Sequence, residues 1–461
     1  MSAAAVSSPP RPSEAGFAVY PPIPQTLEAV GLSGEAIFDL VLKTLYVKGA
    51  RTGHALAEGI CLPFHFVDDQ LLDLQQRRLV EVRGTTGHSR VGYIFDLTQS
   101  GRDRARQALE ANSYVGPAPV PLEQYQTMTH LQTIRRAQVN RAQMERAFKH
   151  VVLHPMMLDL IGPAVNSGRS LFLYGDAGNG KTLIAETIAG LLGDAMFVPH
   201  AVDIDGQIMT VYDPVYHTPV PAPVAHDWAA DTVEASLMRT DGDYDRRYLL
   251  VKRPVVLTGG ELTLDDLDLK YDPFTKLYQA PFQVKANGGV LIVDDFGRQR
   301  VPPRDLLNRW IVPLEKHVDY LTLHTGGKFP VPFDCLLIFA TNIDPGQLVE
   351  EAFLRRIHYK VFVDSPTRDR YDELFRRCCA ERDIAFVPAA VNAIYRNYYE
   401  RLGIEPRACH PRDLTDHIVD AAKFLETPAV LTPELVERAC RSYFLDVERA
   451  AALTPIGANE Q

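Results

Sequence analysis

Cysteine, long apolar runs and an excess of positive charge are all scarce in this sequence of 461 residues. The six cysteines form no Cys-x-x-Cys pair and follow no regular spacing, which excludes the usual zinc-site and disulfide-framework patterns and favours a reducing cytoplasm. No run approaches the roughly 20 apolar residues that span a bilayer, and the first residues lack the basic and apolar regions of a signal peptide. The sequence therefore predicts a cytoplasmic protein without membrane insertion.

The charge balance is negative, because 48 lysines and arginines face 58 aspartates and glutamates, for a net charge of −10. A protein of this charge attracts DNA or another polyanion only through a local basic patch. Apolar residues make up 46% of the chain and charged residues 23%, which is ordinary for a globular protein. At this length, the composition predicts about three domains with cores of their own.

The N-terminal quarter combines a proline-rich start with a pattern of helices and strands. Residues 1–24 contain six prolines among Ser, Ala and Gly, a composition that predicts a disordered tail. Apolar spacing predicts helices at 35–48, 53–58, 63–78 and 98–111, and strands at 79–83 and 90–97 around a turn at 84–87. Three helices and a hairpin indicate a winged-helix-like α+β domain over 31–112. Alternate prolines from Pro117 to Pro121 then predict a semi-rigid linker over 113–124.

Charge in this winged-helix-like domain disfavours DNA as its partner. Residues 31–112 carry ten positive and ten negative side chains. In a DNA-reading winged helix, the third helix lies in the major groove with its N-terminal half facing the bases. Three aspartates occupy that half here: Asp68, Asp69 and Asp73. Because affinity for DNA comes mainly from Lys and Arg, we expect the domain to bind a protein partner, with a minor-groove contact through Arg83 and Arg90 as the alternative.

A glycine-rich loop joins an apolar, strand-like run at 171–174 to a helical pattern at 183–192. It reads Gly-x-x-x-x-Gly-Lys-Thr, and in this strand–loop–helix context it favours a nucleotide site over a glycine-rich turn without a ligand. Backbone N–H groups of such a loop turn toward phosphates, Lys181 would reach the β- and γ-phosphates, and the Thr182 hydroxyl would hold Mg²⁺. The expected nucleotide contacts are Gly175, Asp176, Ala177, Gly178, Asn179, Gly180, Lys181, Thr182 and Leu183.

A second apolar run, 289–293, ends in Asp294 and Asp295, as expected of a strand buried in a parallel sheet. Alone, such a run would be an ordinary strand end. After a phosphate-binding loop, Asp294 is expected to bind Mg²⁺, and Asp295 to orient and deprotonate an attacking water.

Four further polar residues follow, at three places along the chain. Asn342 ends a third buried-strand pattern at 335–341 and would position the attacking water from a neighbouring strand. Arg355 and Arg356 precede a strand-like segment, and by themselves would be a solvated surface pair. Arg412 lies near the start of an amphipathic helix, where the helix dipole disfavours a cation, and this misfit indicates a ligand partner.

The ordered set resembles Walker A, Walker B, sensor 1, arginine finger and sensor 2 of an AAA+ ATPase over about residues 125–450. Segments 280–289 and 350–356 resemble the MoxR-like branch, and uncharacterised bacterial AAA family ATPases are still more similar over 294–300 and 409–414. The resemblance implies ATP or ADP with Mg²⁺ as ligands, and a ring of copies, usually six. It also implies an α/β P-loop NTPase fold with a parallel sheet over 125–364, an α-helical lid over 365–450 and a tail over 451–461.

Two departures from the family pattern bear on catalysis. Asp295 stands where such enzymes usually have Glu, so the base is retracted by one methylene, about 1.5 Å, which leaves a slow-hydrolysing ATP switch as an alternative. The finger position is ambiguous: alignment on a MoxR-like Leu-Asp-Arg-Phe favours Arg356, whereas other branches would use Arg355.

Extra length over about 200–279 predicts an insertion, with a strand-like run at 247–257. Four apolar residues near its start are candidates either for gripping a threaded chain or for local packing: Met209, Val211, Tyr212 and Tyr216. A second projection is predicted at 318–333, as two strands around a Gly-Gly turn, with Lys328 beside the turn as either a partner contact or a solvated lysine.

Two main functions are compatible with these patterns. The first is a chaperone-like ATPase that remodels an unknown protein client, or acts through an adaptor, bound by the N-terminal domain. The second is a nucleic-acid motor or regulator that uses the winged helix as a DNA reader. The slow-hydrolysing switch is the third.

Overall fold

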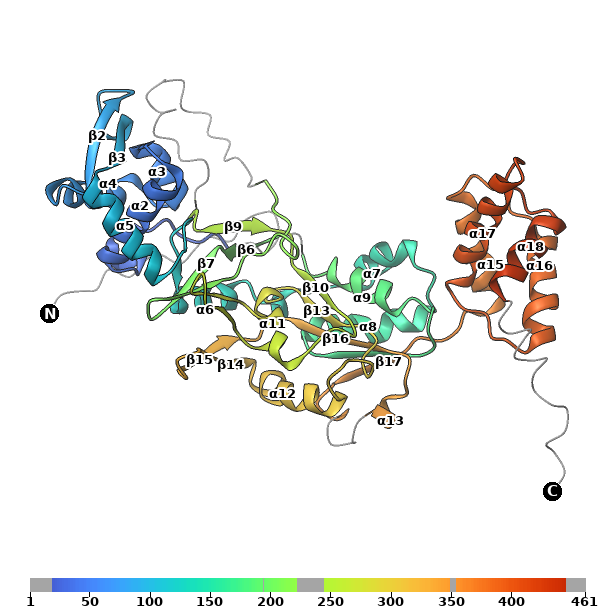
Figure 1. Cartoon of the computed structure of the whole chain (residues 1–461). Helices are drawn as coiled ribbons and strands as arrows, with labels where there is room; N and C mark the ends of the chain where they lie inside the picture. The colour runs from blue at the N-terminus through green and yellow to red at the C-terminus, as the bar shows by residue number, and fades with distance from the viewer. Residues whose placement is uncertain (1–18, 194, 222–243, 349–353, 445–461) are drawn as a thin grey trace.

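The computed structural model describes residues 19–193, 195–221, 244–348 and 354–444. The N-terminal helices and strands and the C-terminal helices lie at opposite ends of the molecule, with the main sheet between them (Figure 1). Within the described ranges, no helix is both long and apolar enough to cross a bilayer.

The N-terminal unit has the helices and the hairpin that the sequence predicts. Its elements are α1 Leu27–Val30, α2 Gly34–Lys48, β1 Arg51–Thr52, α3 Gly53–Ile60, α4 Phe64–Gln76, β2 Val80–Thr85, η1 Arg90–Gly92, β3 Tyr93–Leu97 and α5 Gln99–Ala111. The three strands form an antiparallel sheet in the order β1-β3-β2. Strand β2 runs through Gly84, with an irregularity after Val82, so the turn begins later than expected. Ile37, Leu42 and Phe95 are fully buried between the helices and this sheet.

The segments on both sides of this unit are packed, which differs from the predicted tail and linker. Tyr20 packs against Phe197, with 5.2 Å between ring centroids, and Pro21 accepts a backbone hydrogen bond from Asp245. Strand β4 (Val120–Pro121) pairs in parallel with β7 (Ala201–Ile204), and Val120 is fully buried. Extended prolines fit a sheet edge, because an edge position does not need their missing N–H group.

The centre of the molecule is a five-stranded parallel sheet. Its strands are β5 Leu171–Tyr174, β10 Val255–Thr258, β13 Val290–Val293, β16 Leu336–Thr341 and β17 Tyr359–Phe362, in the order β10-β13-β16-β5-β17. Every pair is parallel, and the strands are mostly apolar, as in sheets buried on both faces.

Helices cover both faces of this sheet. Leu173 and Ile292 belong to a core with α8 (Pro155–Ser167) and α9 (Lys181–Ala189). Phe172 belongs to a second core with α12 (Pro303–Lys316), where Trp310 is fully buried. This arrangement confirms the predicted α/β P-loop NTPase fold. Shorter elements complete this part: α6 Leu122–Leu131, η2 Ile134–Arg136, α7 Arg141–Ala147, η3 Phe148–His150, α11 Phe282–Lys285 and α13 Pro345–Leu348.

The region expected as an insertion forms a second sheet but also supplies one strand of the first. Its elements are β6 Met196–Pro199, β7, β8 Gln207–Thr210, β9 Tyr248–Val251, η4 Leu264–Leu267, β11 Lys270–Asp272 and β12 Leu277–Gln279. The sheet order is β11-β12-β8-β7-β4, while β9 pairs with β6. The predicted single run at 247–257 is therefore two strands, β9 and β10. Pro254 separates them because it has no backbone N–H to continue a ladder.

Burial bears on whether the apolar residues of this region grip a threaded chain or pack locally. Met209 and Val211 are buried in its core, which favours the packing alternative for these two residues. Tyr216 packs edge-to-face on Phe282. The predicted hairpin is confirmed as β14 (Val318–Thr322) and β15 (Lys328–Pro332), and Lys328 is exposed at its turn.

Helices make up the C-terminal part, as expected for a lid. They are α15 Arg368–Ala380, α16 Pro388–Ile394, the π-helix η5 Tyr395–Glu400, α17 His410–Phe424 and α18 Pro433–Tyr443. They enclose a separate core around Tyr371, Phe375 and Ile418. The predicted tail at 451–461 and most of the one at 1–24 lie outside the described residues.

Candidate functional site

The glycine-rich loop leaves the carboxyl end of β5 and enters α9. Gly175, Gly178 and Gly180 have φ angles of 138°, 85° and 83°, a region that glycine adopts without strain. A Cβ on Gly175 would lie 2.4 Å from the Val363 carbonyl oxygen, so neighbouring backbone also requires glycine there. At Gly180, which caps α9, no atom lies within 4 Å of such a Cβ. The loop is thus an open cradle at a helix N-terminus, a geometry that fits phosphate groups.

Lys181 is held inside this cradle. Its Nζ donates hydrogen bonds to the carbonyl oxygens of Gly175 and Asp176, each at 2.9 Å, and the residue is buried. Burial lowers the pKa of Lys181, whereas the nearby carboxylates of Asp294 and Asp295 raise it. The ammonium is therefore bonded to the loop and lies near the two aspartates that follow β13.

Thr182 and Asp294 are brought into direct contact. The Thr182 hydroxyl donates a hydrogen bond of 2.7 Å to Asp294 Oδ2, although Thr182 belongs to α9 and Asp294 directly follows β13. A hydroxyl and a carboxylate are hard oxygen donors, so this pair fits Mg²⁺, which prefers oxygen ligands. Thr182 and Asp294 are the two residues that would hold the ion.

Asp295 stands beside this pair in a special backbone conformation. Its φ is 48°, a left-handed geometry that Asp tolerates better than most residues, and its side chain is exposed. Its N–H donates to Asp294 Oδ1 at 2.9 Å. The Gln299 amide donates to the carbonyl oxygens of Asp294 and Asp295, at 2.9 and 3.3 Å. Gln299 holds this turn in place, a role that no local pattern in the sequence signals.

Asn342 follows β16, the strand between β5 and β13. Asn342 therefore lies at the carboxyl end of the parallel sheet, as do the glycine loop and the two aspartates. Among the residues that the structure describes, the buried Oδ1 atom of Asn342 has no hydrogen-bond partner. Because a buried amide oxygen is costly to leave unpaired, this atom indicates a bound water or ligand.

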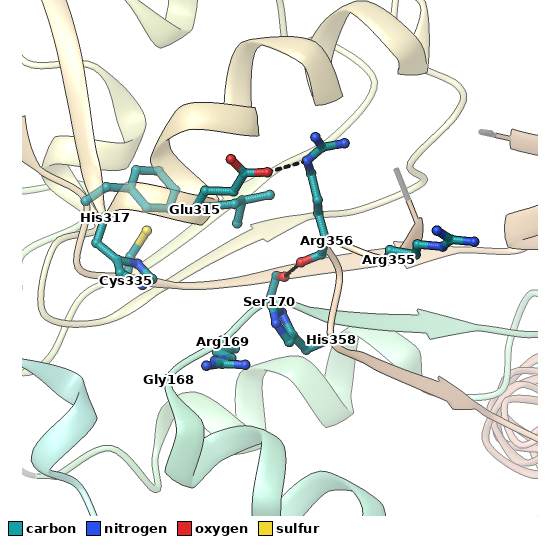
Figure 2. A pocket seen from close by; sticks show the side chains of 11 residues that line it. Gly168, Arg169, Ser170, Glu315, His317, Cys335, Arg355, Arg356 and His358 are labelled. Atoms are coloured by element: carbon teal, nitrogen blue, oxygen red, sulfur yellow. Dashed lines mark hydrogen bonds and ion pairs between the residues drawn. The ribbon is translucent and has the colours of Figure 1, made fainter. Parts of the chain in front are cut away.

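The two arginines lie at the other end of the sheet. They precede β17, whose residues pair in parallel with Leu171–Tyr174, so they lie beyond the amino end of β5 while the loop follows its carboxyl end. Four strand residues alone span about 13 Å. Arg356 Nε donates to Glu315 Oε1 at 2.6 Å, and Arg355 projects away from Glu315 (Figure 2). Neither arginine reaches the glycine loop of its own chain.

Arg412 lies in the first turn of α17, as predicted, but contacts a carboxylate of its own helix. Its Nε and Nη2 atoms both donate to Asp413 Oδ1 at 3.2 Å, and its side chain is 65% exposed. This neighbouring charge offsets the unfavourable helix dipole. The misfit noted in the sequence is therefore explained locally.

Residues 407–409, just before α17, contact the glycine loop instead. The Cys409 N–H donates to the Gly178 carbonyl oxygen at 2.9 Å, and the Ala408 N–H to Asn179 Oδ1 at 3.3 Å. Arg407 Cδ lies 3.6 Å from the position of a Gly178 Cβ, and its charge acts to lower the pKa of Lys181. Arg407, just before α17, is therefore a cation beside the loop. Sequence reasoning missed it because the family pattern singles out Arg412.

Comparison with protein families finds one match, and it covers only part of the C-terminal helices. Residues 367–442 match a family described as a domain of unknown function, DUF8689. No curated protein matches the chain.

Solved structures show weak likeness to the chain. The RuvB Holliday junction branch migration motor of Thermotoga maritima is 14% identical, with a TM-score of 0.34 over 68% of this chain and 74% of that one. NtrX from Brucella abortus in complex with ATP is 13% identical, with a TM-score of 0.37 over 78% of this chain and 70% of that one. At these values the fold of the present chain rests on its own strand order and site geometry.

Proposed function

We propose that this chain is a Mg²⁺-dependent ATPase of the AAA+ type. The main support is the hydrogen bond between Thr182 and Asp294. It joins the start of the helix after the phosphate loop to the carboxylate that follows β13, at the carboxyl end of the sheet. Lys181 lies between them as the phosphate-binding cation. We assign residues 125–364 to the nucleotide domain and 365–450 to its lid.

The residues divide the reaction between them. The glycine loop and Lys181 bind the phosphates of ATP, and Thr182 and Asp294 would hold a magnesium ion, which would offset the phosphate charge. Asn342 orients a water, and Asp295 takes a proton from it as its oxygen attacks the γ-phosphorus and the bond to the ADP oxygen breaks. The exposed position of Asp295 leaves room for that water. The Asp295 side chain is one methylene shorter than glutamate, which favours slow ATP turnover. Slow turnover is also what the ATP-switch alternative expects.

We infer that the protein is active as a homo-oligomer, and that this oligomer is a hexameric ring. Support comes from Arg355 and Arg356, which lie at the sheet end opposite to the glycine loop and so suit the site of a neighbour. An arginine supplied in trans stabilises the charge of the transition state.

ATP turnover per chain should therefore rise with protein concentration, and turnover should require Mg²⁺. Steady-state phosphate release across a concentration series, with particle imaging of the same samples, measures both. Constant turnover per chain from monomeric to fully assembled samples would contradict a trans site.

Arg407 should matter more for nucleotide binding than Arg412, because it lies against the glycine loop whereas Arg412 is paired with Asp413. Arg407→Ala should weaken ATP binding by about tenfold, the typical value for one charge-assisted hydrogen bond. Arg412→Ala is the matched control and should change the affinity by less than about threefold. A fluorescent ATP analogue titrated into both variants gives the comparison, and the reverse order would restore Arg412 as the lid arginine.

For residues 31–112 we propose a winged-helix domain that binds a protein client or adaptor. Its two wing arginines are already paired with carboxylates: Arg90 Nε lies 2.6 Å from Asp68 Oδ1, and Arg83 Nη1 lies 2.8 Å from Asp96 Oδ2. Pairing lowers their capacity to replace the counterions of DNA. A chaperone-like remodelling function is favoured over a nucleic-acid motor for this reason. Six free thiols support a cytoplasmic location.

The full chain should accordingly show no submicromolar binding to duplex DNA at physiological salt, where specific DNA-binding proteins bind at about 10 nM or tighter. Fluorescence anisotropy with labelled duplexes at several salt concentrations tests this. Submicromolar, salt-sensitive binding would overturn the protein-docking proposal. Loss of that binding in Arg83→Ala/Arg90→Ala would locate the contact on the wing.

A further inference from the structure

Asn179 is a buried residue on an otherwise open part of the glycine loop. It is 5% exposed, whereas Asp176, Ala177 and Gly178 just before it are exposed. The pattern Gly-x-x-x-x-Gly-Lys-Thr leaves this position unspecified, so binding of phosphate by backbone N–H groups does not require asparagine there. A buried amide needs hydrogen-bond partners, because an unpaired one costs free energy. The partners of Asn179 therefore indicate what its side chain does.

Both ends of the Asn179 amide bind residues of the C-terminal part. Its Oδ1 atom accepts from the Ala408 N–H at 3.3 Å, and its Nδ2 atom donates to Ser365 Oγ at 3.4 Å. Ser365 lies in the connection between β17 and α15, and its hydroxyl donates to Glu405 Oε2 at 3.3 Å. Glu405 and Ala408 both belong to the connection between η5 and α17. Asn179 thus connects the glycine loop to the segment that enters the C-terminal helices and to the segment that precedes α17.

The backbone next to Asn179 makes the same contact closer. The Cys409 N–H donates to the Gly178 carbonyl oxygen at 2.9 Å. A Cβ on Gly178 would lie only 2.6 Å from Cys409 Sγ, so the absence of a side chain there lets the two segments meet. Because backbone and side chain both join them, the loop cannot shift relative to residues 405–409 without losing these hydrogen bonds.

Residues 405–409 are also anchored in the core of the C-terminal helices. His410, the first residue of α17, is buried, and its Nδ1 atom accepts from the Arg407 N–H at 3.3 Å. The Tyr399 hydroxyl lies 2.9 Å from the same Nδ1 atom and 2.9 Å from the Tyr371 hydroxyl of α15. The segment is therefore held between the glycine loop on one side and a buried polar network of three helices on the other.

We propose that Asn179 is a positioning residue that couples nucleotide binding at the glycine loop to the position of the C-terminal helices. The coupling rests on the proposed ATPase function, because a nucleotide must bind the loop for it to act. A nucleotide that orders the loop also favours the bound position of residues 405–409, and by linkage the bound helices favour the nucleotide. Without the Asn179 amide, the Ala408 N–H loses its acceptor, while the backbone N–H groups of the loop remain.

Amide hydrogen exchange in the full chain, measured on peptides that cover residues 405–412, tests the contact without nucleotide. Asn179→Ala should speed exchange there by about threefold to tenfold, the range expected for loss of one neutral hydrogen bond. Asn287→Ala is the matched control and should leave this exchange unchanged. Asn287 is also buried, and its amide likewise accepts from a backbone N–H, of Asp334, and donates to a hydroxyl, of Tyr125.

Asn179→Asp distinguishes loss of the hydrogen bond from loss of folding. The aspartate keeps an acceptor for the Ala408 N–H and another for the Ser365 hydroxyl, so exchange without nucleotide should stay slow. Unchanged exchange in Asn179→Ala would overturn the proposal, as would exchange in Asn179→Asp as fast as in Asn179→Ala.

The second arm adds ATP and Mg²⁺ to the same proteins, with binding measured in parallel by a fluorescent ATP analogue. ATP should slow exchange of residues 405–412 by about threefold or more in the wild type and in Asn287→Ala, but by less than about twofold in Asn179→Ala. Bound ATP without this response in the wild type, or with the full response in Asn179→Ala, overturns the coupling and leaves the ATPase function standing. Absence of ATP binding in the wild type overturns the ATPase function and the coupling with it.

Discussion

Asp295→Asn should leave ATP binding intact and lower ATP turnover by about two to four orders of magnitude, the usual contribution of a general base. In the proposed mechanism, Lys181, Thr182 and the glycine loop hold the nucleotide, whereas the exposed Asp295 carboxylate acts only on the water. Asparagine has nearly the same shape but cannot accept the proton. Titration of a fluorescent ATP analogue and a phosphate-release assay separate the two steps.

Lys181→Ala is the control, because it should abolish ATP binding itself. Two charge-assisted bonds from its ammonium to phosphate oxygens contribute about 3–6 kcal/mol, so the affinity for ATP should fall at least about a hundredfold. Asp295→Glu extends the carboxylate by one methylene and distinguishes a slow enzyme from a switch, since turnover should rise if reach is what limits it. Wild-type turnover in Asp295→Asn would assign the base to another group.

Mixtures of two inactive variants should recover ATP hydrolysis. Arg356→Ala chains keep an intact glycine loop, and Lys181→Ala chains keep an intact arginine. Because the arginine lies at the opposite end of the sheet from the loop of its own chain, each mixed contact of the right orientation assembles one complete site. An arginine finger contributes about 10³–10⁵ in rate, so turnover of each variant alone should be close to background.

The dependence on mixing ratio gives a sharper test, because recovered activity should be greatest near equal amounts of the two chains. Mixtures of Arg355→Ala with Lys181→Ala chains identify which arginine acts. No recovery at any ratio, in samples where imaging shows mixed assemblies, would contradict a trans role for Arg356.

Local patterns predicted the parts of this protein whose structure depends on near neighbours in the sequence. The glycine loop and the apolar strand that ends in Asp294 were recognisable because each combines a conformational requirement with a chemical one within a few residues. The N-terminal helices were predicted for the same reason, since apolar spacing defines the buried face of α2. Each of these elements lies close to its predicted bounds.

Tertiary structure alone decided which distant residues meet. Pro254 divides a run that reads as one strand, and only pairing with β13 assigns β10 to the core sheet. Arg407 lies against the glycine loop while Arg412 does not, although the family pattern favours Arg412. The sequence by itself determined the fold class and the chemistry of the loop and its aspartates, because side-chain type and short-range spacing specify them. The packing of segments far apart in the chain determined the positions of the arginines, and no local spacing encodes that packing.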